Sequence, residues 1–414
     1  MTNNKDKKVL NVPNLRFPEF IEEWKIVSLK DIAVVNPKSE PLQNKFFYID
    51  LEAVEKGELK KIQEILQEEA PSRAQRVISN NDILFQCVRP YQKNNYIHRV
   101  PNTSNIQWIA STGYAQIRTT ESPNYIYHLL NTDRFNRKVM VRCTGSSYPA
   151  INSEDLSTIH FYLSTDKKEQ CKIARLLDLL DERIATQNKI IEDLKKLKSA
   201  ICEKLFSSPK DKQPQIRLYG FFGDWHFVRL SDICHRICRK NTGEQCKQVL
   251  TIAAQYGLVS QEEFFNKNVA SENLSGYYLL QKGDFAYNKS YSGDYVWGTV
   301  KRLDNYEQGV LSPLYICFRP DPARVDSDFL IYYFESKKWH KTVANIAGEG
   351  ARNHGLLNIS VVDYFNTIHC IPSMDEQKQI AQIIGTLLSK IAREQRMLNC
   401  YAAQRQYLLR QMFI

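Results

Sequence analysis

The 414-residue sequence lacks the features that would place it in a membrane or a secretory pathway. No stretch approaches the roughly 20 consecutive apolar residues that span a bilayer, and the lysine-rich segment 1–10 has no apolar signal-peptide core. The 10 cysteines are scattered through the chain, which at this length favours reduced thiols over a disulfide framework. These absences predict a cytoplasmic protein.

Recognisable catalytic motifs are also missing. The sequence has no glycine-rich Rossmann or P-loop fingerprint, no Gly-x-Ser-x-Gly turn and no His-Glu-x-x-His pair. It has neither the Asn-Pro-Pro-aromatic run of amino-methyltransferases nor the clustered carboxylates of a metal nuclease. Cys234, His235, Cys238 and Cys246 lie close together, but no second CxxC-type pair accompanies them to complete a zinc site. We therefore expect a chain that binds and positions a partner, without a metal or cofactor of its own.

The overall composition is that of a folded protein with a positive balance. Charged residues make up 25% of the chain and apolar residues 43%, which is ordinary for globular domains and too apolar for a disordered chain. At this length two or more domains are expected. The net charge of +10 favours a polyanionic partner such as nucleic acid.

One hydrophobic seam occurs twice, with an offset of 207 residues. Both copies step alternately by four and three residues, which is the rhythm of a helix whose narrow apolar stripe faces another helix. The polar interruptions also match, Gln187 with Glu394 and Lys198 with Arg405. The apolar seam positions are Ile173, Leu177, Leu180, Ile184, Ile191, Leu194, Ile201 and Leu205 in the first copy, and Ile380, Ile384, Leu387, Ile391, Leu398, Tyr401, Leu408 and Met412 in the second.

Each seam predicts a helix of about 40 residues, which is roughly 60 Å long at 1.5 Å per residue. A helix with so narrow a stripe needs a partner, and the other copy is the simplest one. A parallel, in-register pair would set Lys198 against Arg405, whereas an antiparallel pair avoids this contact. We therefore predict an antiparallel coiled coil; the alternative is that each helix packs on its own domain.

The repeat extends beyond the helices. Each half begins with an Arg-x-x-x-Phe motif, continues with Leu-x-Asp-Ile and a strand-like run, and closes with a Glu-Gln pair at the start of the seam. The matching segments are Arg16–Phe20 with Arg217–Phe221, Trp24 with Trp225, Leu29–Ile32 with Leu230–Ile233, Asn81–Phe85 with Gly283–Tyr287, Thr158–His160 with Thr367–His369, and Glu169-Gln170 with Glu376-Gln377. A duplicated chain implies two similar tasks held apart by the helices.

The sequence predicts an α+β protein of two mixed α/β domains, two long helices and an internal pseudo-two-fold repeat. Short β-branched and aromatic runs predict strands, and two segments predict small helices. The expected strands are Phe46–Asp50, Ile83–Val88, Gln107–Ile109, Ala115–Arg118, Tyr277–Leu280 and Leu314–Phe318, and the expected helices are Ser122–Leu130 and Asp326–Glu335. The expected divisions are domain 1 at 1–165, helix 1 at 166–206, a proline-containing linker at 207–216, domain 2 at 217–373 and helix 2 at 374–414.

Several loop segments combine basic, amide and aromatic residues, as DNA-contacting surfaces do. Arginine can bind guanine through two hydrogen bonds, asparagine and glutamine can bind adenine, and lysine suits phosphate. For any single residue the alternative is a solvated loop. The candidates are Arg73, Gln75, Arg76, Arg89, Tyr91, Lys93, Asn94, Ser146, Ser147 and Tyr148 in the first half, and Lys289, Ser290, Tyr291, Tyr295, Lys341, Arg352, Asn353 and His354 in the second.

The order of these motifs resembles a known family, the specificity subunits of type I restriction–modification systems. The resemblance spans nearly the whole chain and depends on the order and duplication of the motifs. The residues that carry it are Arg16–Phe20, Trp24, Ser72–Arg76, Val88–Tyr91, Glu169-Gln170, Ile173-Ala174, Phe221, Trp225, Glu376-Gln377 and Ile380-Ala381.

The resemblance implies a non-catalytic subunit that recognises DNA. Each half would be a target recognition domain for one part of a bipartite target, and the helices would set the gap and dock methyltransferase subunits. Restriction–translocase subunits would join the complex, and S-adenosylmethionine, ATP and Mg²⁺ would be bound by the partner subunits. Because the domain interiors diverge strongly, an asymmetric target is expected. The alternatives are a coiled-coil adaptor without sequence preference and a diverged nuclease or methyltransferase.

Overall fold

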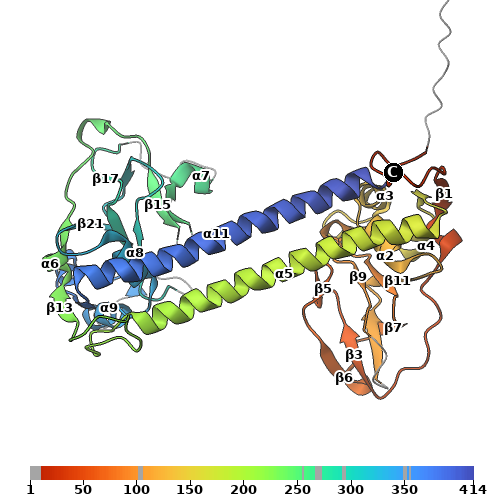
Figure 1. The fold of residues 1–414 in the computed structure, drawn as a ribbon, viewed down its shortest axis with the longest axis horizontal. Helices are drawn as coiled ribbons and strands as arrows, with labels where there is room; N and C mark the ends of the chain where they lie inside the picture. The colour runs from red at the N-terminus through yellow and green to blue at the C-terminus, as the bar shows by residue number, and fades with distance from the viewer. Residues whose placement is uncertain are drawn as a thin grey trace, which may run out of the picture. The chain divides into compact units, whose positions relative to one another are not determined.

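The computed structural model describes residues 11–100, 106–253, 256–265, 273–290, 295–347 and 356–414, and the backbone of residues 352–353. The chain forms two compact units (Figure 1). Unit 1 comprises residues 1–189 and 396–414, and unit 2 comprises residues 190–395. Because each unit takes in part of both long helices, these units cut across the five segments expected from the sequence.

Two helices exceed all other elements in length, and both cross the boundary between the units. They are α5 (Lys167–Leu205), with 39 residues, and α11 (Met374–Gln411), with 38. Their lengths agree with the helices of about 40 residues predicted from the two seams. No helix in the described part of the chain is long and apolar enough to cross a membrane.

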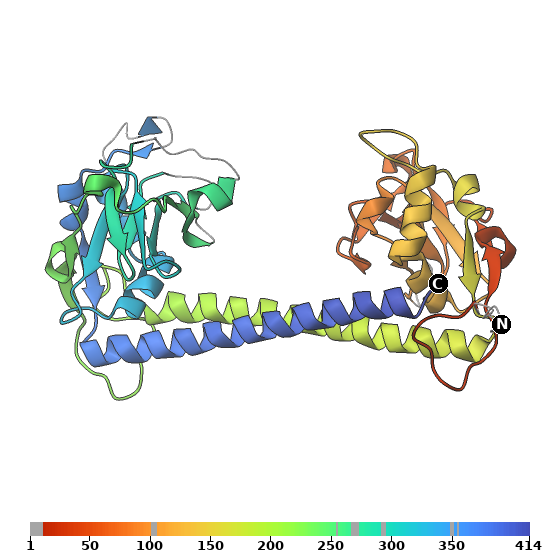
Figure 2. The same cartoon turned by 90° about the horizontal axis from the view of Figure 1, so that it is seen from above.

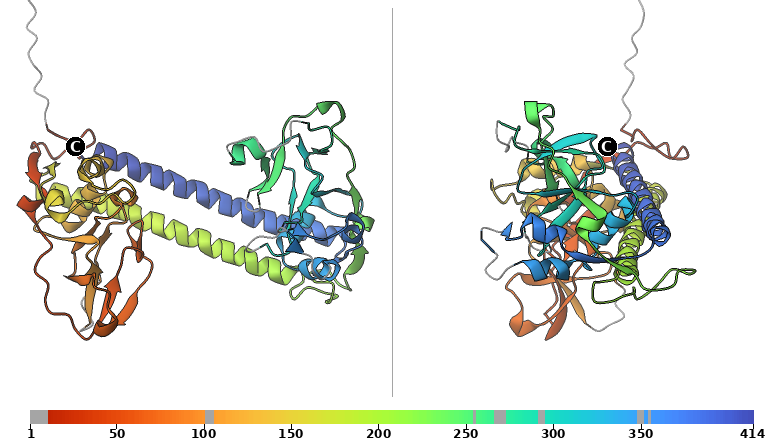
Figure 3. Two further views of the ribbon diagram at one scale, coloured as in Figure 1. Left: turned by 180° about the vertical axis from the view of Figure 1, so that it is seen from behind. Right: turned by 90° about the vertical axis from the view of Figure 1, so that its left-hand side faces the viewer.

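Unit 1 contains two four-stranded sheets and a strand pair. One sheet has the order β2-β11-β8-β9, the other β6-β3-β10-β7, and β1 pairs with β12. The β6-β3-β10-β7 sheet extends away from the α5 segment of this unit (Figures 1 and 3). The helices are α1 (Leu29–Ile32), α2 (Pro123–Leu130), α3 (Asp133–Arg142) and α4 (Ser153–Ser157), with 3-10 turns η1 (Gln67–Glu69) and η2 (Pro90–Gln92); the strands are β1 (Lys25–Ser28), β2 (Ala33–Val35), β3 (Lys45–Ile49), β4 (Val54–Glu55), β5 (Glu58–Leu59), β6 (Gln63–Leu66), β7 (Ala74–Ile78), β8 (Ile83–Gln86), β9 (Tyr96–Ile97), β10 (Gln107–Ser111), β11 (Tyr114–Thr119) and β12 (His160–Leu163).

Unit 2 repeats this plan. The sheet β14-β21-β18-β19 and the pair β13–β24 match β2-β11-β8-β9 and β1–β12. The pairs β15–β16 and β17–β20 are joined by a parallel bridge between Val249 and Val310, which reproduces the order β6-β3-β10-β7. The helices are α6 (Leu230–Ile233), α7 (Gln261–Phe265), α8 (Ser327–Glu335), α9 (His340–Ile346) and α10 (Val361–Phe365), with η3 (Thr242–Glu244); the strands are β13 (His226–Arg229), β14 (Cys234–Arg236), β15 (Leu250–Ala253), β16 (Gly257–Ser260), β17 (Tyr278–Gln281), β18 (Phe285–Asn288), β19 (Thr299–Arg302), β20 (Gln308–Leu311), β21 (Ile316–Pro320), β22 (Arg352–Asn353), β23 (Leu356–Leu357) and β24 (Ile368–Ile371).

The two long helices run antiparallel, as the seam predicted. In unit 1 the beginning of α5 lies beside the end of α11 (Figures 1 and 2), and Asp181 pairs with Arg405. In the same unit the Arg183 guanidinium lies 5.8 Å from the centre of the Tyr401 ring. The two seam cations, Lys198 and Arg405, lie in different units, and each has its own carboxylate partner. Arg405 binds Asp181 in unit 1, and Lys198 binds Glu335 at 2.7 Å in unit 2.

Every seam position is buried or partly buried. Leu177 and Ile384 are fully buried, and Ile191 and Ile380 nearly so. The polar seam residues Gln187 and Glu394 are also buried, at 5% and 8% exposure. The four-three rhythm of the sequence therefore corresponds to the covered face of both helices.

The end of each helix completes the core of the unit that it reaches. Phe413, just after α11, lies 6.3 Å from Trp24 and 5.2 Å from Tyr125, between ring centres, in the core of unit 1. Phe206, just after α5, lies 5.5 Å from Phe329 in the core of unit 2. The C-terminal residues are thus part of the fold of the first domain.

The repeated Arg and Glu of the two motifs form a buried ion pair at the start of each long helix. Arg16 donates to both oxygens of Glu169, at 2.6 and 2.9 Å, and Arg217 does the same to Glu376, at 3.1 and 2.9 Å. Both carboxylates are essentially unexposed. The indole N–H of Trp24 also donates to Glu169, at 3.0 Å. The motif therefore ties the beginning of each domain to its long helix.

The glutamine of each Glu-Gln pair connects the long helix to a second helix. The Gln170 side-chain oxygen accepts from the backbone N–H of Ser122, the N-cap of α2, at 3.1 Å. The Gln377 oxygen accepts from the N–H of Asp326, the N-cap of α8, at 2.8 Å. The repeated Arg, Glu and Gln residues are therefore structural joints.

Candidate nucleic-acid interface

The arginine-rich loops of unit 1 meet at one end of its two sheets. The turn between β10 and β11 links two of them, because the Thr112 N–H donates to the Arg73 carbonyl at 2.9 Å, while the glycine after Thr112 accepts from the Cys87 N–H at 3.0 Å. The Arg89 N–H donates to the Pro149 carbonyl at 2.8 Å. Segments 73–76, 87–91 and 144–150, which are separate in sequence, thus form one surface.

The β7 segment contributes one half-buried and two exposed side chains to this surface. Arg73 and Gln75 are exposed, and the Gln75 amide donates to the Ser72 carbonyl at 2.6 Å. Arg76 is half-buried, and its Nε is enclosed without a hydrogen-bond partner in the described part of the chain. Burial lowers the pKa of this guanidinium. A half-buried arginine without a carboxylate beside it is suited to an anionic or electronegative ligand.

The loop after α3 presents an exposed ring beside Arg89. Backbone hydrogen bonds of 2.9 Å in both directions between Thr144 and Ala150 close the loop. Gly145 has φ +89°, and a Cβ there would lie 3.0 Å from the Tyr148 carbonyl oxygen, so the loop requires glycine. The Tyr148 side chain is 64% exposed. The neighbouring serines Ser146 and Ser147 are also exposed.

Two of the predicted residues, Lys93 and Asn94, face a different part of the molecule. Lys93 binds Asp133 at 2.6 Å, and this ammonium group holds the pKa of the Asp133 carboxyl below its usual value. The Asn94 side-chain oxygen accepts from the Lys56 N–H at 3.0 Å. These contacts hold unit 1 together, whereas Arg89 and Tyr91 have no such partner among the described residues.

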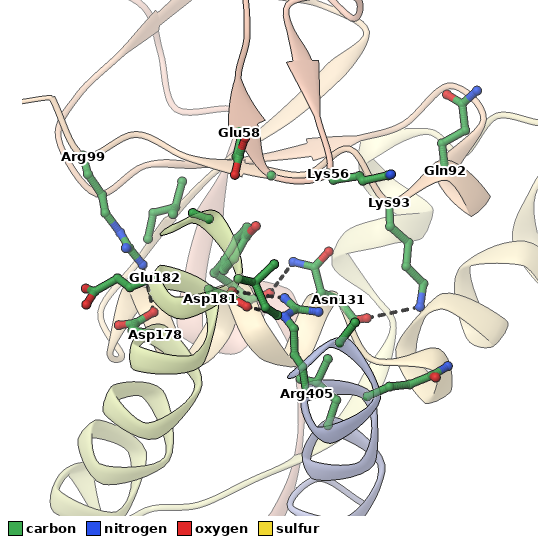
Figure 4. Close-up of a pocket in the computed structure, with 18 of the residues that line it drawn as sticks. Lys56, Glu58, Gln92, Lys93, Arg99, Asn131, Asp178, Asp181, Glu182 and Arg405 are labelled. Carbon is green, nitrogen blue, oxygen red and sulfur yellow. Dashed lines mark hydrogen bonds and ion pairs between the residues drawn. The ribbon is translucent and has the colours of Figure 1, made fainter. Parts of the chain in front are cut away.

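The Lys93 ion pair lies at the edge of a polar cavity of about 580 Å³ (Figure 4). The cavity lies between the β4–β5 turn, α2 and the paired ends of α5 and α11. Its charges neutralise one another, because Arg99 binds Asp178 at 3.0 Å and Arg405 binds Asp181. The cavity is therefore a charged joint between the sheets and helices of unit 1.

The structure describes fewer of the candidates in unit 2. The Lys289 ammonium donates to the Ile359 carbonyl at 3.4 Å, and the Ser290 N–H donates to the Asn288 side chain at 2.9 Å. Tyr295 is partly exposed and Lys341 exposed. Tyr291 and His354, and the side chains of Arg352 and Asn353, lie outside the described residues. The DNA-contacting roles of the candidates in both units stay predictions.

Lys341 lies in a concentration of positive charge. The side-chain contact with Lys210, together with the like charge of the two ammonium groups, lowers the pKa of Lys341. In the described part of the chain, no three His, Cys, Asp or Glu side chains are arranged to hold a metal ion. Cys234 and Cys246 are buried, whereas Cys238 is exposed.

The long helices also have a second apolar stripe, which is exposed and was not predicted from the seam. Leu176 and Ile190 of α5 are 36% and 39% exposed, and their repeat partners Ile383 and Met397 of α11 are 40% and 39% exposed. The position between them is also shared, as Arg183 in one copy and Lys390 in the other. The sequence contained a signal for this stripe, because its positions are seven residues apart and recur after 207 residues.

The fold defines a duplicated protein of two domains with the same sheet order, each built on part of two long helices. Residues 21–196 match the family of the type I restriction modification DNA specificity domain. This part of the chain is similar to that family, and unit 2 repeats the sheet order of unit 1. No curated protein matches the chain by sequence.

Two solved structures share the fold. The type I restriction–modification S subunit from M. genitalium aligns with a TM-score of 0.57 and 15% identity, covering 97% of this chain and 99% of that one. A chain from a study of complex assembly and conformational transition of the type I R-M system aligns with a TM-score of 0.55 and 19% identity, covering 93% of this chain and 96% of that one. These likenesses extend over both units.

Proposed function

We propose that this chain is the DNA sequence-specificity subunit of a type I restriction–modification complex. The observation that carries the proposal is the specificity-domain match over residues 21–196, together with a second unit of the same topology. Each unit would bind one half of a bipartite DNA target. Because the loop residues differ between the units, the two half-sites would differ in sequence.

In unit 1 the proposed contact surface comprises Arg73, Arg76, Arg89, Tyr91 and Tyr148. In the described part of the chain the guanidinium groups of Arg73, Arg76 and Arg89 have no carboxylate partner, in contrast to Arg16, Arg99 and Arg118. Unpaired arginines beside an exposed aromatic ring are suited to phosphates and base edges. A coiled-coil adaptor without DNA specificity would have no need of such a surface.

The test is to map methylated adenines in cells that express the chain with its methyltransferase subunit. We expect a bipartite, asymmetric motif. Replacing residues 1–165 with the corresponding domain of another family member should change one half of the motif and leave the other half and the gap unaltered. A motif that is unchanged by the swap, or methylation without any motif, would contradict the proposal.

The exposed stripe on the long helices supports two equivalent docking sites for methyltransferase subunits. An apolar side chain that is about two-fifths exposed gains little from the fold of this chain, yet both copies have one at the same two positions. Unit 1 contains Leu176 and Met397, and unit 2 contains Ile383 and Ile190. Each unit therefore presents an apolar residue at each of the two equivalent positions, as the binding of two copies of one partner requires.

Charged substitutions in this stripe should remove the partner without unfolding the chain. Leu176→Glu should lower the number of bound methyltransferase subunits from two to one, and so should Ile383→Glu, because each places a carboxylate in one apolar interface. The double variant should bind none. Native mass spectrometry of the reconstituted complex measures the stoichiometry.

The matched control is Val141→Glu, since Val141 is 86% exposed and belongs to α3, not to either long helix. This variant should keep both partners. If the double variant also keeps both, the docking sites lie elsewhere on the chain.

Catalysis would then belong to the partners. Methyl transfer from S-adenosylmethionine to an adenine extruded from the duplex, and ATP- and Mg²⁺-dependent restriction, would take place in subunits that this chain positions on DNA. The lengths of α5 and α11 would set the gap between the half-sites. The complex would act in the cytoplasm, where bacterial DNA is located.

A further inference from the structure

The backbone at Arg89 has a conformation that a non-glycine residue rarely adopts. Its φ and ψ are both 54°, in the left-handed region, and the next residue is the buried Pro90. A proline further restricts the residue before it. The hydrogen bond from Arg89 to Pro149 and the bridge between Val88 and Ala150 hold the conformation in place. Such strain is retained where the surrounding structure needs a side chain in one direction.

The Arg89 side chain is also fixed in place. Its guanidinium carbon lies 4.3 Å from the centre of the Tyr148 ring, in a cation–π stack. Within the described residues, this guanidinium has neither a hydrogen bond nor an ion pair. The stack covers a face of the planar group and leaves the N–H donors at its edge available. Arg89 thus presents a pair of N–H donors for which the described residues supply no acceptor.

A second arginine without a partner lies nearby. Arg76 is close enough to Cys87, two residues before Arg89, for its charge to act on the Cys87 thiol. Its enclosed Nε has no acceptor among the described residues. Two guanidinium groups lie beside one strained loop, and neither has a carboxylate partner among the residues that the structure describes. This arrangement indicates that a ligand supplies the missing acceptors.

We infer that Arg89, held by Tyr148, recognises a guanine in the DNA half-site bound by unit 1. This inference rests on the proposed function. Guanine presents two acceptors, N7 and O6, on its major-groove edge, and they match two parallel donors of a guanidinium. Phosphate contacts need no fixed direction, whereas base recognition does, which is why the strain and the stack favour a base.

Unit 2 has a different residue at the corresponding place. The bridge between Ser290 and Leu356 corresponds to the bridge between Val88 and Ala150, so position 291 corresponds to position 89. The residue there is tyrosine, whose side chain has no pair of parallel donors. The guanine contact therefore belongs to the half-site of unit 1 alone.

The experiment compares the methylated motifs of complexes that contain the full-length chain with Arg89 unchanged, Arg89→Ala or Arg89→Lys. In the unit 1 half-site, identified by the swap of residues 1–165, we expect one G·C pair at which both variants lose discrimination by about ten-fold or more. Lysine keeps the charge but loses the fork of two donors. Tyr148→Ala should relax the same position, because the guanidinium is then no longer held. The other half-site and the gap should not change.

Arg73→Ala is the comparison variant for a phosphate contact. Arg73 is exposed and has no ion pair among the described residues, so its loss should weaken DNA binding at every site and reduce the salt dependence without altering the motif. If Arg89→Lys and Tyr148→Ala also keep the motif unchanged, or if the unit 1 half-site has no G·C pair, the inference is wrong while the proposed function stands. Absence of any motif with the unaltered chain would instead overturn the proposed function.

Discussion

Glu169→Ala is expected to destabilise unit 1 by about 3–5 kcal/mol, because it leaves the Arg16 guanidinium partly buried without its counter-ion. The glutamate is fully buried and accepts from Arg16, from the Trp24 indole and from the Ser164 hydroxyl at 2.5 Å. Its loss deprives three donors at once. Hydrogen exchange, followed by mass spectrometry, should show faster exchange throughout unit 1.

The matched variant in the second copy is Glu376→Ala. Its effect should fall in unit 2 and be smaller, because the Trp225 indole N–H has no partner within the described part of the chain and so loses nothing. Glu182→Ala, at an exposed position of α5, should change stability by less than about 0.5 kcal/mol. If Glu169→Ala and Glu182→Ala change the stability of unit 1 equally, the buried Arg16–Glu169 ion pair does not tie the domain to its long helix.

Phe413→Ala is expected to destabilise unit 1 by about 3–5 kcal/mol, as large-to-small changes of a buried phenylalanine do. Phe413 is 4% exposed and packs edge-on against Trp24, although almost the whole chain separates the two residues in sequence. Urea unfolding, combined with hydrogen exchange to locate the change, should show loss of protection around Trp24 and Tyr125.

Tyr407→Ala serves as the control for this variant. Tyr407 lies in the same last turns of α11 but is 57% exposed, so the variant should behave like the unaltered chain. Phe206→Ala should produce the corresponding loss in unit 2. If Phe413→Ala leaves the protection of unit 1 intact, the end of α11 does not contribute to that core.

The repeat pattern predicted much of the fold. The expected strands at Phe46–Asp50, Gln107–Ile109 and Ala115–Arg118 correspond to β3, β10 and β11, and the expected helices correspond to α2 and α8. These predictions succeeded because periodicity is a local property of the chain. The antiparallel direction followed from comparing the two copies, because only this direction keeps the two seam cations, Lys198 and Arg405, apart.

The candidate site was predicted less completely. Arg73, Arg89 and Tyr148 come together on one surface, but Lys93 and Asn94 were selected by the same local composition and prove to be tied to Asp133 and to the Lys56 backbone. Composition shows which side chains are capable of binding DNA. It does not show which of them find a partner within the protein, because those partners are distant in sequence.

The sequence by itself determined that the chain is duplicated, that each copy ends in a long helix with one apolar seam, and that recognisable catalytic motifs are missing. Only the tertiary structure decided that the repeated Arg, Glu and Gln residues are joints, that the end of α11 completes the first domain, and that Arg89 is held on Tyr148. The physical reason is distance along the chain: periodicity and composition are written in neighbouring residues, whereas an ion pair, a ring stack or an unfilled donor exists only once distant segments have met.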